Sequence, residues 1–137
     1  MNQRKKVLLK IFVALLILII ISSCKQSTEP NHDPVVNSIV AFPNQVQVSD
    51  SFAVFCSADD ADGDPLTYDW FCTNHGASIK GALPDNPYEL KNTRDNIMIF
   101  FATDTLIYQT GHAAIFCDVR DNKGGLKTAW ILVGITR

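Results

Sequence analysis

From residue 35 onward the chain consists of short runs in which every second residue is large and apolar. A clear example is the run 51–58, where Phe52, Val54 and Cys56 occupy alternate positions. A period of two is typical of β-strands that bury one face. We therefore expect strands at 35–42 with a continuation at 45–48, and at 51–58, 66–72, 77–80, 96–102, 111–120 and 127–136.

Turn-forming residues separate these runs. Clusters of Pro, Asn, Asp and Gly occur at 43–44, 59–65, 74–76, 84–87 and 122–125. Segment 81–95 has no strand pattern, so we expect it to be the longest irregular connection. Seven short strands in about 100 residues predict an all-β sandwich of two sheets.

The first 23 residues have the three parts of a secretory signal peptide. A basic stretch that ends at Lys10 precedes 11 uninterrupted apolar residues, and Ser22 and Ser23 close the segment before Cys24. The apolar run is shorter than the roughly 20 residues that a membrane-spanning helix needs. The alternative is an uncleaved N-terminal anchor that ends in an ordinary thiol.

The tetrapeptide Ile-Ser-Ser-Cys at 21–24 resembles the box of bacterial lipoproteins. The resemblance implies that signal peptidase II cuts before Cys24, whose sulfur carries a diacylglycerol and whose amine is acylated, for example with palmitate. Two or three acyl chains hold a protein stably at a membrane. Lys25 stands where Asp is the usual inner-membrane retention signal, so the expected location is the outer membrane, on either of its faces.

The residues that follow Cys24 are polar up to Pro34 and include no large apolar side chain. Such a composition is typical of a flexible stalk. The expected organisation is a signal peptide at 1–23, a stalk at 24–34 and one domain at 35–137.

Two blocks resemble the PKD-type and related immunoglobulin-like domains of bacterial proteins. The first is Ala-Asp-Asp-Ala-Asp-Gly-Asp-Pro-Leu-Thr-Tyr-Asp-Trp at 58–70, and the second is Gly-x-Ala-x-Ile-x-Cys-x-Val-x-Asp-x-x-Gly-Gly at 111–125. The resemblance implies a seven-stranded immunoglobulin-like sandwich. Two departures are Ala113, where the family has Tyr, and the run 97–101, which replaces a Trp-bearing strand.

Alternation directs Cys56, Cys72 and Cys117 toward the interior. The order Cys56, Trp70, Cys117 resembles the immunoglobulin pattern, in which cysteines of opposite sheets are bonded beside a Trp. In an exported protein the resemblance implies a disulfide between Cys56 and Cys117, which would stabilise the domain by roughly 4 kcal/mol. A bond between Cys72 and Cys117, or three buried thiols, are the alternatives.

Charge argues against a nucleic-acid partner. Four of the 12 Lys and Arg residues lie among the first ten residues, so 8 basic residues face 14 acidic ones after the signal peptide. Binding to phosphates needs a clustered basic face, and the sequence has none.

Residues with catalytic or metal-binding spacing are scarce. Asp60, Asp62 and Asp64 have the spacing of a calcium loop, but an EF-hand alignment needs a carboxylate where Ala58 stands. The simpler interpretation is that these carboxylates and Gly63 satisfy the backbone of a turn. The sequence has no nucleophile elbow, zinc pair or phosphate loop, so we expect no metal, no cofactor and no enzymatic activity.

The last strand can have either of two registers. If it buries its β-branched residues, then Phe71, Phe116 and Trp130, together with Leu132, face outward on three neighbouring strands and form a surface for a glycan, a protein or a second copy. From sequence alone we favour the plainer alternative, in which Trp130 and Leu132 lie inside or 81–95 covers the stripe.

These patterns favour a lipid-anchored envelope protein that acts as a non-catalytic binding or adhesion module for a glycan or a protein. The alternative is a structural or accessory subunit of a larger envelope assembly.

Overall fold

The computed structural model describes residues 30–103 and 111–136, and Asn31–Arg137 form one compact unit. The expected signal peptide at 1–23, the lipidation candidate Cys24 and residues 25–29 of the expected stalk lie outside the described residues. The described part contains nine strands: β1 Val35–Phe42, β2 Gln45–Gln47, β3 Ser51–Asp59, β4 Thr67–Cys72, β5 Ala77–Ile79, β6 Glu89–Thr93, β7 Ile97–Ala102, β8 His112–Arg120 and β9 Leu126–Thr136.

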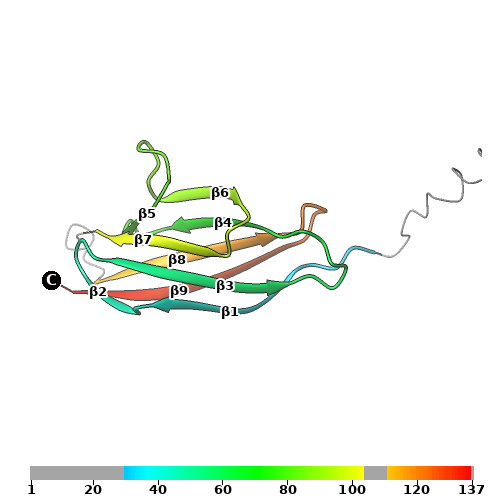
Figure 1. The fold of residues 1–137 in the computed structure, drawn as a ribbon, viewed down its shortest axis with the longest axis horizontal. Coiled ribbons are helices and arrows are strands. Elements are labelled where there is room, and N and C mark those ends of the chain that lie inside the picture. The colour runs from blue at the N-terminus through cyan, green and yellow to red at the C-terminus, as the bar shows by residue number, and fades with distance from the viewer. Residues whose placement is uncertain (1–29, 104–110, 137) are drawn as a thin grey trace, which may run out of the picture. The chain divides into compact units, whose positions relative to one another are not determined.

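The strands form two sheets, and the domain is all-β (Figure 1). One sheet has the order β1-β3-β7-β5, and the other has the order β2-β9-β8-β4-β6. Without β2 and β6, the chain order of the remaining strands in the two sheets is that of the constant-type immunoglobulin sandwich. The expectation of an immunoglobulin-like fold is therefore met at the level of architecture.

The expected number of seven strands is wrong, for two reasons. After Pro43, which cannot donate to a strand ladder, the chain leaves β1, and β2 pairs in parallel with β9 of the other sheet. Segment 81–95, expected to be irregular, contains β6, which pairs with β4 at the edge of that sheet. Its apolar alternation is weak because only Leu90 packs against the core.

The core lies between the sheets and follows the expected alternation. Phe52, Val54 and Cys56 of β3 are buried, as are the alternate residues of β8 from Ala113 to Val119. Trp70 of β4 is fully buried, and its Nε1 donates a hydrogen bond to the Asp95 carbonyl at 3.1 Å. The two sheets are therefore joined by side chains that the period of two had marked as inward.

The expected disulfide between Cys56 and Cys117 is not present. Cys56, Cys72 and Cys117 are buried free thiols, although Trp70 lies opposite Cys117 in the ladder as the immunoglobulin pattern requires. The Cys56 and Cys117 thiols hydrogen-bond each other, and this bond together with burial raises the pKa of Cys117. The same hydrogen bond lowers the pKa of Cys56, so Cys56 is the more acidic thiol of the two.

The domain begins at Asn31, earlier than the expected boundary at residue 35. Asn31 Nδ2 donates to Asp121 Oδ2 at 2.6 Å, and the His32 amide donates to Asp62 Oδ2 at 2.8 Å. Pro34 is fully buried. The last residues of the expected stalk are thus part of the folded unit.

We expect Trp70→Ala to lower the free energy of unfolding by about 3 to 5 kcal/mol, because it removes the largest buried side chain of the core. The matched control is Trp130→Ala, since Trp130 is largely exposed and its truncation should cost about 1 kcal/mol or less. Urea denaturation followed by circular dichroism measures both. Equal losses for the two variants would contradict this description of the core.

Candidate functional site

Three aromatic side chains stand in line on the outer face of the five-stranded sheet. Phe71 of β4 pairs with Phe116 of β8, and Phe116 pairs with Trp130 of β9. The ring centroids are 5.4 Å apart for Phe71 and Phe116 and 6.3 Å apart for Phe116 and Trp130, and the rings are nearly parallel. We call Phe71, Phe116 and Trp130 the aromatic row.

The aromatic row lies on the outer face, where Phe71 and Phe116 are half-buried and Trp130 is exposed. Trp130 is 58% exposed and Leu132 is 48% exposed, whereas Val133 and Ile135 of the same strand are buried. The register that we favoured from sequence, with Trp130 and Leu132 inside, is therefore wrong. The physical reason is that β9 buries its β-branched residues, which fill the space between the sheets. Within segment 81–95, β6 is an edge strand that pairs with β4, and the segment leaves Trp130 uncovered.

Polar side chains adjoin the row on the same face. Arg120 Nε lies 3.0 Å from Asp69 Oδ2, and Arg120 Nη2 lies 3.5 Å from Asp118 Oδ2. The Thr128 hydroxyl donates to Asp118 Oδ1 at 2.5 Å. An apolar centre beside a polar margin is the common composition of a protein interface.

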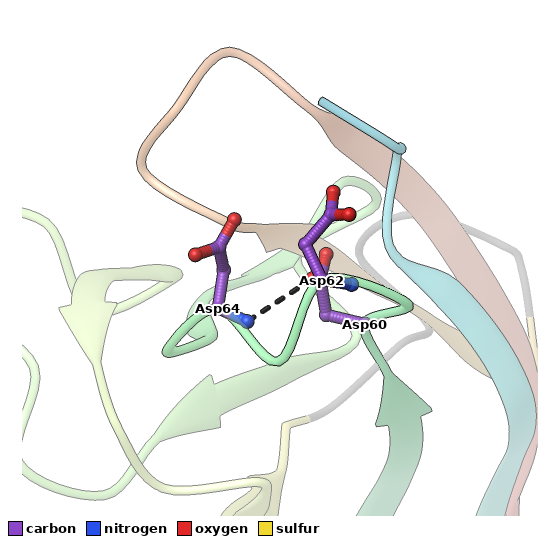
Figure 2. A group of neighbouring side chains, drawn as sticks. All are labelled: Asp60, Asp62 and Asp64. Atoms are coloured by element: carbon purple, nitrogen blue, oxygen red, sulfur yellow. Dashed lines mark hydrogen bonds between the residues drawn. The ribbon is translucent and has the colours of Figure 1, made fainter. Parts of the chain in front are cut away.

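The acidic corner between β3 and β4 gathers three carboxylates. Asp60, Asp62 and Asp64 each have an oxygen within 4.8 Å of the others, as the spacing of a cation loop requires (Figure 2). Asp60 Oδ1 accepts hydrogen bonds from the amides of Asp62 and Asp64, at 2.9 and 3.1 Å. This is the turn function expected from sequence.

Lys123 neutralises part of this corner, and the His32 ring hydrogen-bonds to it. Lys123 Nζ lies 2.6 Å from Asp64 Oδ1, and His32 Nδ1 lies 3.0 Å from Asp62 Oδ1. Hydrogen bonds from the His32 amide and ring lower the pKa of Asp62, and Asp64 raises the pKa of Lys123. Asp60 Oδ2 and Asp64 Oδ2 are buried and without a hydrogen-bond partner, so these three carboxylates are the residues that could hold a cation.

Sequence reasoning identified the carboxylates but missed their partners. Lys123 belongs to the connection between β8 and β9, and His32 to the segment before β1. Neither has a local pattern that marks it, since the contacts form only when distant turns meet. The corner thus joins three separate segments of the chain.

Surface hollows on the described part of the domain lie away from the aromatic row and the acidic corner. One, of about 460 Å³, is lined by Pro43, Gln45, Val46, Gln47, Asp50, Ser51 and Thr136. Another, of about 300 Å³, is lined by Leu83, Asn86, Glu89, Leu90 and Lys91. Neither lining includes a residue of the aromatic row or of the acidic corner.

Comparison with known proteins identifies no family. No family model and no curated protein matches the chain. Among solved structures, a nucleoside hydrolase-related hypothetical protein from Saccharophagus degradans, associated with carbohydrate metabolism, is similar at 18% identity with a TM-score of 0.49, over 77% of this chain and 26% of that one.

The N-terminal eight Ig domains of Down Syndrome Cell Adhesion Molecule are similar at 14% identity with a TM-score of 0.44, over 77% of this chain and 12% of that one. The chain therefore spans a small part of both proteins. At these TM-scores neither likeness bears on function, and the description of the fold rests on the strand order.

In the described residues, 30–103 and 111–136, no helix has the length and apolar character needed to cross a membrane.

The buried carboxylate of Asp121, in the turn between β8 and β9, makes the stability of the domain sensitive to acid. Its oxygens accept hydrogen bonds from Asn31 Nδ2 and from the amides of Lys123 and Gly125, and these bonds lower its pKa. A depressed pKa in the folded state contributes stability above the unfolded value of about 3.9, and that stability is lost as the pH falls through the folded pKa.

We therefore expect Asp121→Asn to be less stable than wild type at neutral pH, and the difference to shrink as the pH falls below about 4. Asp85→Asn, at an exposed loop position, is the control and should change little at either pH. Melting temperatures across the pH range measure the effect. A difference for Asp121→Asn that stays constant into acid would show that its charge does not matter.

Proposed function

We propose that this protein is a non-catalytic binding module of the cell envelope, which holds its partner on the aromatic row and is attached to a membrane through lipid on Cys24. The observation that carries the proposal is the outward alignment of Phe71, Phe116 and Trp130 in one register across three strands.

Physical chemistry supports contact through this row. Burial of water-exposed aromatic surface lowers the free energy by roughly 25 cal/mol per Å². Aromatic side chains are enriched at the centres of interfaces because they bring a large area at a small cost in conformational entropy. The rings stack on one another, which limits their rotamers before a partner arrives. Less entropy is then lost on binding.

The chemistry beside the row suits a partner with both apolar and hydroxyl or amide groups. Asp118, Thr128 and Arg120 offer charged and hydroxyl groups next to the rings. A glycan can place an apolar ring face on Trp130 and hydrogen-bond its hydroxyls to such groups, and an extended protein segment can do the same with side chains and backbone. Protein and glycan remain the two partner classes of the proposal.

The membrane attachment rests on the sequence. Only a short segment separates Cys24 from Asn31, where the folded unit begins. When extended, a segment of that length spans about 25 Å. A lipid on Cys24 would hold the domain close to the bilayer, so its partner would be a component of the envelope or a molecule that reaches it. A fixed role as an accessory subunit of an envelope assembly is the alternative, in which the row would be a permanent protein contact.

To test the row, intact cells that produce the full chain are treated with a crosslinker, and the adducts of wild type and of Phe116→Ser/Trp130→Ser are compared. We expect the adducts to fall at least about tenfold while the melting temperature changes by a few degrees at most, since both side chains are outward. Val35→Ser, which removes an exposed apolar side chain at the start of β1, is the control and should leave the adducts unchanged. If the double variant loses much stability while its adducts are unchanged, the aromatic row supports the fold and does not bind the partner.

To test the anchor, the mass of the envelope protein is measured, and we expect a chain that starts at Cys24 and carries acyl groups. Cys24→Ser should release the protein from the membrane fraction, because the anchoring energy of about 0.8 kcal/mol per buried methylene is lost. An intact Met1 on the membrane-bound protein would exclude the lipoprotein assignment.

A further inference from the structure

The four-stranded sheet is apolar on its outer face as well as on its inner face. Its outward large residues are Val40, Phe42, Phe55, Ile97, Ile99 and Phe101, which we call the apolar face. Phe42 is 76% exposed, and the others apart from the half-buried Ile99 are more than 40% exposed. An antiparallel sheet that has one face on the core normally turns polar residues outward.

The ladder makes these residues one continuous patch. Val40 pairs with Phe55, and Phe55 pairs with Ile97, so three strands contribute to a single row. Phe42 and Ile99 both lie opposite Ala53, and Phe101 follows two residues after Ile99 on the same strand. A continuous exposed apolar patch of this size is uncommon on a solitary domain.

Charge is nearly excluded from this face. The remaining outward side chains on the four strands are mostly small or hydroxyl-bearing: Ser38, Ser51, Ala53, Ser57 and Ser78. The charged residues next to it stand at its margins, with Asp59 at the end of β3 and Lys80 just after β5. The centre of the face therefore has no charged side chain that could form an ion pair with a charged partner.

We infer that the apolar face binds a second copy of this chain, face to face about a two-fold axis. A copy of the face matches it, because the uncharged centre of one copy meets the uncharged centre of the other while the charged residues stay at the margins. The chain after the signal peptide has 14 acidic against 8 basic residues, so two copies carry like net charge, and an uncharged face lets them meet with the least repulsion.

The exposed area agrees with this occupant. The five most exposed side chains of the face present about 500 Å², so two copies would bury about 1,000 Å², near the lower end of specific interfaces. Two antiparallel sheets also pack naturally face to face at about 10 Å with their strands aligned. The dimer is therefore expected to be reversible, with a dissociation constant in the micromolar range.

The first test uses the full chain in intact cells, with Phe55 replaced by the photocrosslinking residue p-benzoylphenylalanine. Irradiation should give an adduct of twice the protomer mass. The same residue in place of Trp130, on the opposite sheet, is the control and should give no such adduct. An adduct of another mass from position 55 would assign the face to a different protein, a small increase would assign it to lipid, and no adduct would leave the face solvent-exposed; each of these results overturns the inference.

The second test measures copurification of two differently tagged full-length copies produced together. Phe55→Lys places like charges in the two-fold contact, so the copurified fraction should fall at least about tenfold. Leu83→Lys, an equal change at an exposed apolar residue of the connection between β5 and β6, should leave it unchanged. Equal losses for the two variants, or no loss for Phe55→Lys when the wild-type copies copurify, would contradict the inference. Because the aromatic row is on the other sheet, failure of this inference leaves the proposed binding function intact.

Discussion

The contact between Trp70 and Phe100 joins the two sheets at the centre of the domain. Their ring centroids are 6.2 Å apart with the rings inclined by 70°, an edge-to-face arrangement, and both side chains are fully buried. Phe52 stacks on Phe100, and Tyr68 lies beside Trp70, so one aromatic cluster spans both layers. The other buried residues of both sheets belong to the same hydrophobic core, and their inward orientation determines which residues of each strand face outward.

The aromatic row follows directly from that constraint. Because Trp70 and Cys72 point into the core, Phe71 between them must point out, and the pairing of β4 with β8 then brings Phe116 beside it. The same logic applies on the other sheet, where burial of Val54 and Cys56 turns Phe55 outward. Both outer surfaces are consequences of the core, although their residues have no role in it.

One end of the sandwich is tied together by polar contacts. Asp121 binds the backbone of its own turn and the side chain of Asn31, and Lys123 of that turn reaches Asp64. Gly125 is required there, since a Cβ atom would overlap the Asp121 carboxylate and approach Pro34. Turns that are separate in sequence are thereby tied to the segment before β1.

The sequence by itself determined the strands and the inward set of residues, because a period of two and turn residues are local signals. It could not show β6, whose pairing with β4 depends on a neighbour and not on its own pattern. Nor could it choose the register of the last strand, since 127–136 offers apolar residues on both faces. That choice, and with it the exposure of Trp130, was made by the tertiary structure, because only the space between the sheets selects which face of the strand is buried.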